Sequence, residues 1–259
     1  MAHGIEVWGV LKKWKLNFLK KHCEIWAVSD FTAQQLLQKQ IPTKNIKVLN
    51  NCLDPYFNPP SSFVKPTNLL EKYQLSVKQP ILFTLTRISS QEQYKGYDKV
   101  IQLLPKLIEN HPTLHYILAG KADEIEKAKI LNLIKDLKLE QHVTLTGYLE
   151  DEEIKNHFLL ADAFVMPSEG EGFGISFIEA AACGCLSVAG NVDGSKDALM
   201  DGKLGKLIDP NNQFMLENAI IETLEIAKTT FSKEAVKTTC LTKFSYENYK
   251  MNTLKLLTN

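Results

Sequence analysis

The chain has no long apolar run and no excess of charge of either sign. No stretch of its 259 residues approaches the roughly 20 consecutive apolar residues that a membrane-spanning helix needs. Its 30 basic and 30 acidic side chains balance, so that no overall charge favours nucleic acid as a partner. A chain of this length and ordinary apolar content is expected to form one large or two small globular domains.

Cysteine is scarce, and the cysteines are scattered. They lie at Cys23, Cys52, Cys183, Cys185 and Cys240. An odd, dispersed set is typical of a reducing cytoplasm rather than of a disulfide-rich secreted protein. Cys183 and Cys185 form the one close pair, and we expect them to be small buried residues rather than metal ligands.

Two ligand-binding motifs are also missing. No Asp-x-Asp pair occurs in the sequence, so a divalent ion that bridges a diphosphate is not expected, and we predict neither a metal nor a cofactor. No Gly-x-Gly-x-x-Gly follows the first strand expected in the main domain, which weakens the alternative of an NAD-dependent dehydrogenase.

From residue 78 onward, short apolar segments alternate regularly with helical patterns. Strands are expected at 81–86, 115–119, 143–146, 163–166, 186–189 and 206–208. Helices are expected at 97–110, 123–138, 151–160, 175–183 and 211–228. This order predicts an α/β fold with a doubly wound, Rossmann-like parallel sheet, in which ligands bind at the carboxyl ends of the strands.

A glycine-rich turn joins one of these strands to the next helix. Residues 167–185 read Pro-Ser-Glu-Gly-Glu-Gly-Phe-Gly-Ile-Ser-Phe-Ile-Glu-Ala-Ala-Ala-Cys-Gly-Cys. The free N–H groups of such a turn and the positive end of the helix dipole suit a phosphate. Glu171 and Glu179 would repel a phosphate but can accept hydrogen bonds from sugar hydroxyl groups. The segment therefore predicts a nucleotide-sugar site.

The same segment resembles the signature of retaining GT-B glycosyltransferases of family four, through Glu-Gly-Phe-Gly, the second Glu and Ala-Cys-Gly. The resemblance implies a GT-B-type fold that moves a sugar from a nucleoside-diphosphate sugar to a saccharide or lipid-linked acceptor, in bacterial polysaccharide or glycolipid assembly. It implies retention by front-face attack, in which the leaving phosphate takes the proton of the acceptor. It covers nearly the whole chain and is strongest from 87 to 210.

Two basic residues stand where this family binds the diphosphate. The family pattern Arg-x7-Lys-Gly-x-Asp is matched by Arg87, Lys95, Gly96 and Asp98. A positive charge about 4 Å from a phosphate contributes on the order of 4 kcal/mol at an effective dielectric constant near 20. The alternative interpretation is that both residues are solvated loop charges.

The resemblance also implies further contacts to the donor. Glu171, with Arg87 and Lys95 one of the predicted catalytic residues, would contact the transferred sugar, and Glu179 the ribose. Alternatively, Glu171 is a plain loop charge and Glu179 serves the helix dipole or a buried ion pair. The other predicted donor-binding residues are Gly172, Phe173, Gly174, Ile175, Gly120, Gly147, Tyr148, Leu149 and His3. Backbone contacts to the base leave UDP, GDP and ADP equally open.

The first fifty residues contain too few elements for a separate domain. We expect a helix at 9–22, a strand at 24–28, a helix at 30–39 and a strand at 46–49. His3-Gly4, Val28-Ser29-Asp-Phe-Thr32 and Asn50-Asn-Cys-Leu-Asp54 match, in order, features that end the first domain of the family. The chain is therefore expected to be truncated at its amino terminus. The predicted parts are a remnant of the acceptor-side domain (1–54), a linker (55–77), the donor domain (78–240) and a helix that returns to the first domain (241–259).

Residues 8–22 interleave five lysines with aromatic and aliphatic residues. Such a segment can lie on an anionic membrane, which predicts peripheral contact at the inner face of the membrane. The alternative is a docked helix with a solvated lysine face. Two other functions also stay open: a nucleotide-sugar-binding fragment without transfer activity, and a GT-B sugar-nucleotide epimerase or phosphorylase, which the Glu171–Glu179 segment disfavours.

Overall fold

Six parallel strands form the central sheet of the computed structural model, which describes residues 1–229 and 233–258. They are β3 (Ile81–Leu85), β4 (His115–Ala119), β5 (Val143–Gly147), β6 (Ala163–Met166), β7 (Ser187–Gly190) and β8 (Gly205–Ile208). Their order in the sheet is β5-β4-β3-β6-β7-β8. The chain order therefore reverses between β3 and β6, which makes this pair the topological switch point of a doubly wound sheet. The α/β class and the six predicted strands are confirmed.

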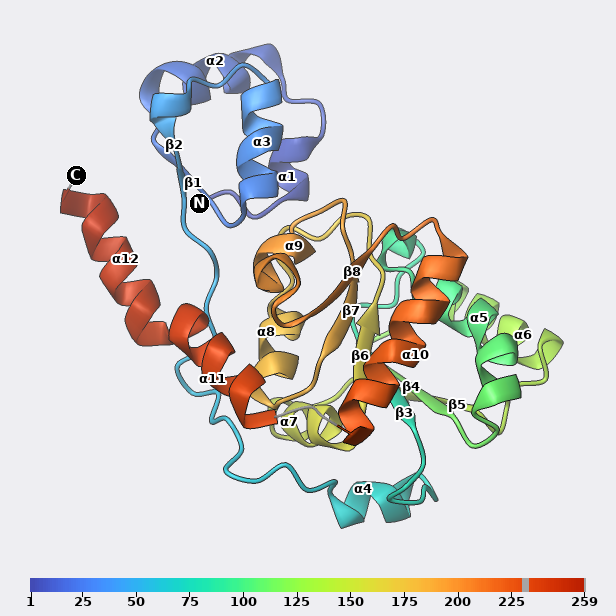
Figure 1. Cartoon of the computed structure of the whole chain (residues 1–259). Helices are drawn as coiled ribbons and strands as arrows, with labels where there is room; N and C mark the ends of the chain where they lie inside the picture. Colours follow the sequence, from blue (N-terminus) through green and yellow to red (C-terminus); the bar gives the residue numbers. More distant parts are fainter. Residues whose placement is uncertain (230–232, 259) are drawn as a thin grey trace.

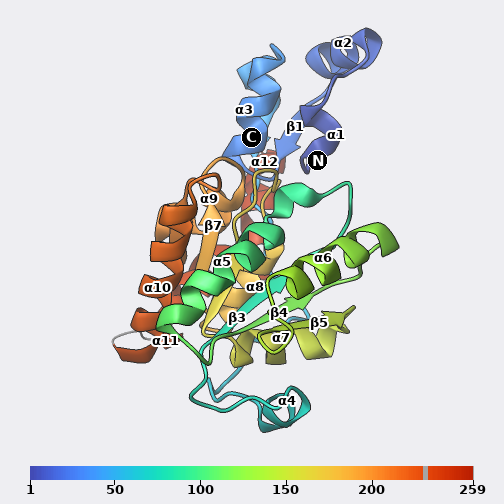
Figure 2. The same ribbon diagram turned by 90° about the vertical axis from the view of Figure 1, so that its right-hand side faces the viewer.

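Helices cover both faces of this sheet (Figure 1). One face carries α5 (Tyr97–Asn110), α6 (Glu124–Asp136) and α10 (Gln213–Thr229), the first two of which lie in front in Figure 2. The other face carries α7 (Asp151–Leu160), α8 (Ile175–Ala182), the short α9 (Ser195–Ala198) and α11 (Lys233–Phe244). Burial on both faces explains why a strand such as β6 is an unbroken apolar run.

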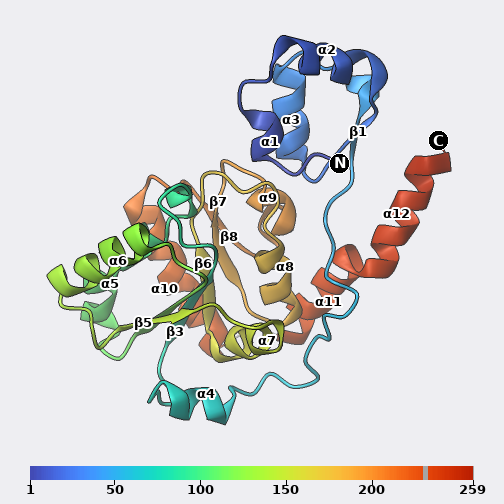
Figure 3. The same ribbon diagram turned by 180° about the vertical axis from the view of Figure 1, so that it is seen from behind.

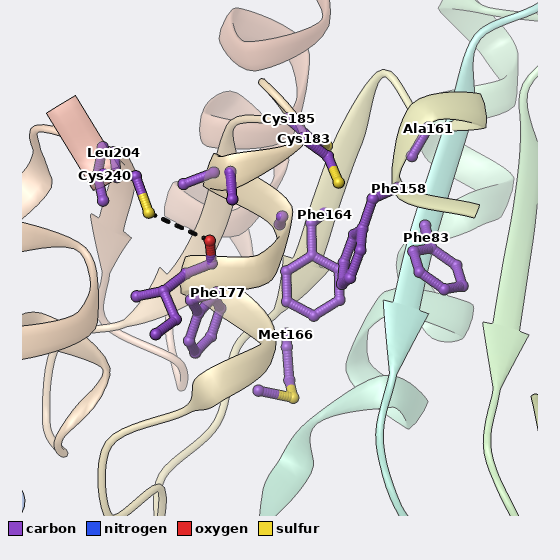
Figure 4. Close-up of a cluster of buried hydrophobic side chains, with 14 of the residues drawn as sticks. Phe83, Phe158, Ala161, Phe164, Met166, Phe177, Cys183, Cys185, Leu204 and Cys240 are labelled. Carbon is purple, nitrogen blue, oxygen red and sulfur yellow. Dashed lines mark hydrogen bonds between the residues drawn. The ribbon is translucent and has the colours of Figure 1, made fainter. Parts of the chain in front are cut away.

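A row of aromatic rings fills the core on the α7–α8 side (Figure 4). Phe83, Phe158, Phe164 and Phe177 pack edge to face, with neighbouring centroids 5.3 to 5.4 Å apart. The row links β3, α7, β6 and α8. Cys240 of α11 donates from its thiol to the carbonyl of Ile178, 3.2 Å away, and so joins α11 to the same core.

Cys183 and Cys185 are buried at the end of α8. Burial raises the pKa of the Cys185 thiol to about 12, which keeps the thiol protonated. Their expected role as small core residues is confirmed.

The first fifty residues form a small unit beside the main sheet. It contains α1 (Ile5–Trp8), α2 (Lys13–His22), β1 (Ile25–Ala27), α3 (Asp30–Gln38), a 3₁₀ turn (Thr43–Asn45) and β2 (Ile46–Val48). Strands β1 and β2 pair in parallel, and Ser29 caps α3 by accepting from the N–H of Thr32. Apolar side chains of α1, β1 and α3 form its core.

The helix predicted at 9–22 is found as α2, but it begins only at Lys13, and the short helix α1 before it was not predicted. Gly9 ends α1 in an extended conformation, and Val10 is fully exposed. Glycine is a poor helix former, and no burial of residues 9–12 offsets its cost.

Residues 49–66 run from the small unit alongside α11 to the short helix α4 (Thr67–Lys72), as seen from behind in Figure 3. Two hydrogen bonds join this segment to α11, from Leu53 N–H to Phe244 O and from Lys237 Nζ to Pro60 O. The sequence pattern did not reveal α4, whose Leu69 and Leu70 are buried in the core.

The last helix, α12 (Tyr246–Thr258), follows α11 and extends towards the small unit. Lys47 of β2 donates to Leu256 O at 3.0 Å. The carboxyl-terminal helix therefore contacts the small unit directly.

Two glycines with positive φ allow the close packing of strand ends to be tested. A Cβ on Gly120, after β4, would lie 1.7 Å from Thr86 O, whereas a Cβ on Gly147, after β5, would have no neighbour within 4 Å. We expect Gly147→Ala to cost about 1–2 kcal/mol through backbone strain alone. Gly120→Ala should cost at least about 2 kcal/mol more, because the carbonyl belongs to the neighbouring strand end and has no room to move.

Urea unfolding of both variants measures this difference. Gly147→Ala is the matched control, since it makes the same change at a positive φ without the clash. Equal losses in the two variants would contradict the packing described for the strand ends.

Candidate functional site

The predicted site lies at the carboxyl edge of the sheet, on the loops that follow β3, β6 and β7. Parallel strands bring these loops to one edge, and the switch point between β3 and β6 sets the first two side by side. The loop after β6 is the glycine-rich turn at 167–174. Most of the predicted site residues therefore come from neighbouring loops.

Lys95 and Glu171, two of the three predicted catalytic residues, are in direct contact. Lys95 ends a 3₁₀ turn (Gln93–Lys95), and its ammonium group pairs with Glu171 Oε1. The two side chains are only 10% and 14% exposed, so water screens the pair weakly. The Lys95 ammonium also lies 5.3 Å from the centroid of the Tyr94 ring. An anion that enters this edge would find a cation already held in place.

Arg87, the third, is held elsewhere. It follows β3, and its Nη2 lies 2.7 Å from Glu92 Oε1. The Arg87 side chain is 76% exposed, and exposed ion pairs contribute only about 0–1 kcal/mol. The guanidinium group can therefore leave Glu92 for a stronger anion at small cost.

The glycine-rich turn lies against the first residues of the chain. A Cβ on Gly172 would lie 1.9 Å from His3 O, so only glycine permits this approach. The structure thus brings His3, which is exposed, to the turn that carries Glu171.

The turn ends at Gly174, which has a φ of +88° and starts α8 without a side-chain cap. The first N–H groups of α8 are therefore not used by a capping side chain and can bind an anion. Ile175 follows and is 45% exposed. Phe173 is different, because its ring is buried against Phe244 and only its backbone faces the turn.

Glu179, on α8, borders a separate cleft of about 500 Å³. The cleft is lined by Asp54, Tyr56, Phe57, Asn58, Asp151, Glu152, Ile154, Lys155 and Glu179. Burial, with the nearby carboxylates of Asp151 and Asp54, raises the pKa of Glu179 to about 7. Glu179 is therefore a carboxyl group that changes its protonation state near neutral pH.

The residues after β4 and β5 that are predicted to contact the donor differ in their surroundings. Gly120 is required for the packing against Thr86, whereas nothing lies near Gly147. Tyr148 is 63% exposed, and Leu149 is buried in the core. Gly147 and Tyr148 are thus open to a ligand, and the side chain of Leu149 is not.

Asp193 was missed by the sequence analysis. It follows β7 at the same edge and is 1% exposed. Its Oδ2 accepts from Ser168 Oγ at 2.6 Å and from Glu171 N–H at 2.7 Å, and its Oδ1 accepts from Ser195 N–H at 2.9 Å. Its position in the sequence could have revealed it, because Asp193-Gly194 comes shortly after a predicted strand, as Arg87 does.

Among residues 1–229 and 233–258, no group of three or more His, Cys, Asp or Glu side chains is arranged to hold a metal ion.

The comparison with protein families gives one match. A family model described as glycosyl transferases group 1 matches residues 67–237, which is more than half of the chain.

Curated relatives are enzymes of sugar transfer. A GDP-mannose-dependent alpha-(1-6)-phosphatidylinositol monomannoside mannosyltransferase of Mycolicibacterium smegmatis is 30% identical over 161 residues, 60% of this chain and 41% of the relative. An O-antigen chain mannosyltransferase B of Escherichia coli is 28% identical over 203 residues, 78% of this chain and 51% of the relative. The chain thus spans about half the length of these relatives.

Solved structures share the fold. A glycosyltransferase of Rickettsia africae has a TM-score of 0.83 at 24% identity, with 96% of this chain and 67% of that one covered. HepE of Anabaena, solved in complex with UDP, has a TM-score of 0.84 at 20% identity, with 99% and 71% covered. These likenesses confirm the predicted GT-B type of fold.

The raised pKa of Glu179 predicts how stability depends on pH. The pKa is about 7 in the folded chain against an ordinary value of 4.5, so the folded state holds this proton more tightly than the unfolded state. The resulting stabilisation is complete below pH 4.5 and is lost as the pH rises to 7. Glu179→Gln, which mimics the neutral group, should be more stable than the unsubstituted chain by up to about 3 kcal/mol at pH 8.

Urea unfolding at pH 4, 6 and 8 tests this expectation. Glu152→Gln, at an exposed glutamate of the same cleft, is the matched control and should not change the slope with pH. A Glu179→Gln variant whose advantage is the same at pH 4 and pH 8 would refute the assignment.

Proposed function

The chain belongs to the family of glycosyl transferases group 1, and on this premise we propose that it moves a sugar from a nucleoside-diphosphate sugar to an acceptor, with retention and without a metal ion. The observation that carries the proposal is the Lys95–Glu171 pair, which stands beside the uncapped start of α8 at the switch point of the sheet. A cation, free amide groups and a carboxylate meet there, as a diphosphate joined to a sugar requires.

The donor would lie along the carboxyl edge. Its diphosphate would bind Lys95, Arg87 and the first N–H groups of α8. The transferred sugar would lie next to Glu171 and near His3. The ribose would lie in the cleft of Glu179, and the base near Gly147 and Tyr148.

The chemistry we propose is cleavage of the anomeric bond with the charge of the leaving phosphate stabilised by Lys95 and Arg87. Loss of one such preorganised group typically lowers the rate 10²–10³-fold. Following the resemblance to retaining enzymes of this family, we propose front-face attack in which the leaving phosphate accepts the acceptor's proton. A trapped glycosyl ester of Glu171 would overturn this mechanism.

The names of the relatives suggest the class of substrate. Two are mannosyltransferases, one of them GDP-mannose-dependent, and they act on a phosphatidylinositol mannoside and on an O-antigen chain; HepE was solved with UDP. We therefore propose a hexose donor carried by a nucleoside diphosphate and a glycolipid or polysaccharide acceptor.

A second candidate is a nucleotide-sugar-binding fragment without transfer activity. The described part of the small unit has only two paired strands, which offers little surface for an acceptor. If this chain alone turns over a donor faster than a Lys95→Gln variant does, it is an enzyme and not only a binding fragment.

Nucleotide binding is the first test of the proposal. UDP, GDP or ADP at one hundred times its dissociation constant should stabilise the chain by about 2.7 kcal/mol, equally in Mg²⁺ and in EDTA. Lys95→Gln should weaken binding about 10- to 100-fold, because it removes a charged hydrogen-bond partner. Thermal shift and calorimetry measure both effects.

Lys106→Gln is the matched control, because Lys106 also pairs with a buried glutamate, Glu217, but lies between α5 and α10, away from the proposed site. An equal loss of affinity in both variants, or binding that requires Mg²⁺, would contradict the proposed donor site.

The small unit presents a basic and aromatic surface that we propose contacts a membrane. No acidic residue lies between Glu6 and Glu24, and α2 has no buried residue. Trp14 and Phe18, four positions apart and therefore on one side of α2, are 70% and 54% exposed. Helix α2 lies at the outer end of the small unit, away from the sheet (Figure 1).

No helix in the described part of the chain is both long and apolar enough to span a bilayer. The contact that we propose is therefore peripheral. A basic residue near an anionic surface contributes about 1 kcal/mol, and the exposed rings would enter the headgroup region. Such contact at the cytoplasmic face would suit an acceptor that is carried on a lipid.

Vesicle cosedimentation tests this surface. The chain should bind phosphatidylglycerol-containing vesicles at low salt and release them at 0.5 M salt, while neutral phosphatidylcholine vesicles should bind little. Replacing Trp14 and Phe18 with alanine should lower binding at least about tenfold, whereas Phe214→Ala, at an exposed ring of α10, should not. Equal binding to both kinds of vesicle would refute an electrostatic contact.

A further inference from the structure

The loop between β7 and α9 holds the backbone of Glu171 from both sides. Asp193 Oδ2 accepts from the N–H of Glu171 at 2.7 Å, and the next residue, Gly194, donates its N–H to Glu171 O at 2.9 Å. We propose that Asp193 is a positioning residue, which fixes the turn so that the carboxylate of Glu171 faces the transferred sugar. This inference rests on the proposed function and adds to it a residue that does not itself contact the donor.

The chemistry of the site requires a carboxylate at this position. The three donors that surround Asp193 are Ser168 Oγ, Glu171 N–H and Ser195 N–H, and they use both oxygens. A carboxylate accepts at both oxygens, whereas an amide has one oxygen and one NH₂ donor. Burial raises the pKa of Asp193, and these hydrogen bonds, together with the Ser195 side chain, oppose the rise. Burying the Asp193 carboxylate is therefore unfavourable by itself, and the hydrogen bonds that it accepts compensate for the lost water.

The geometry leaves the turn little freedom. A Cβ on Gly194 would lie 2.1 Å from Gly172 O and 2.9 Å from Glu171 O, so the two loops touch backbone to backbone. Ser168, at the start of the turn, is held by the same carboxylate oxygen as Glu171. One side chain therefore ties both ends of the segment 168–171 to the β7–α9 loop.

Helix α9, which follows this loop directly, contacts the small unit. Its Asp197, four residues after Asp193, accepts from Asp30 N–H at 2.9 Å and from the side-chain amide of Asn50 at 3.3 Å. The segment 193–197 therefore contacts the turn that bears Glu171 through Asp193 and the small unit through Asp197.

Asp193→Asn tests the inference. In either orientation of the amide, its NH₂ group faces the N–H of Glu171 or that of Ser195, and one backbone donor loses its acceptor. We expect hydrogen exchange at the Glu171 amide to become at least about tenfold faster. The affinity for a nucleoside-diphosphate sugar should fall about tenfold, while that for the nucleoside diphosphate alone changes less than about threefold.

Two further variants keep the test decisive. Asp201→Asn makes the same change at an exposed aspartate eight residues away and should alter neither reading. If Asp193→Asn does not fold, Ser168→Ala removes only one of the three donors, and it should also speed exchange at Glu171, by a smaller factor. Unchanged exchange at Glu171 in the variant that folds would overturn the inference.

A double-mutant cycle separates positioning from general damage. In a Glu171→Gln background, Asp193→Asn should lower the affinity for the sugar nucleotide no further, because its effect acts through the carboxylate of Glu171. Additive losses would overturn the positioning role. If the unsubstituted chain binds no nucleotide, the proposed function fails and with it the role towards the sugar, while exchange at Glu171 still decides whether Asp193 fixes the turn.

Discussion

The close approach of three backbone segments at the carboxyl edge of the sheet is the constraint on which the site depends. The loops after β3, β6 and β7 meet there backbone to backbone, because Gly96 lies against Pro167 O and Gly194 lies against Gly172 O with no room for a Cβ. Parallel strands make this meeting possible, because they end at one edge, and the switch point brings the first two loops together. The positions of Lys95 and Glu171 follow from this backbone arrangement.

The pairing of Lys95 with Glu171 gives each of these buried charges a partner of opposite sign, without which its burial would be unfavourable. Removing an ion from water without a partner costs several kcal/mol, so each side chain stabilises the charged form of the other in the absence of a ligand. A diphosphate that arrives must offer Lys95 a partner at least as good as Glu171. The sugar that it carries can then offer hydroxyl groups to the released carboxylate. Under the proposed function, the diphosphate of the donor replaces Glu171 as the partner of Lys95, and the sugar of the donor replaces Lys95 as the partner of Glu171.

The strands and the location of the site could be predicted, because both depend on patterns within a few neighbouring residues. Ala163–Met166 is an unbroken apolar run before a glycine-rich turn, which predicts a buried parallel strand and a ligand-binding edge together. The start of the helix predicted at 9–22 could not be placed correctly, because the effect of Gly9 depends on whether its neighbours are buried. Phe173 and Leu149 were assigned to the donor site by their place in a motif, and because the fold buries both side chains, only their backbone groups are left for the predicted contacts. Asp193 was missed because its partners, Ser168 and Glu171, are distant in sequence.

The carboxyl group of Glu179 links the cleft to the proton concentration of the solvent. With a pKa of about 7, this group is divided between its neutral and charged forms at neutral pH, and any ligand that prefers one form takes up or releases a fraction of a proton on binding. The heat of such binding would include the ionisation enthalpy of the buffer, and the affinity would change across the range in which most cells regulate their internal pH. Under the proposed function, a donor that contacts Glu179 through its ribose would bind with an affinity that depends on pH.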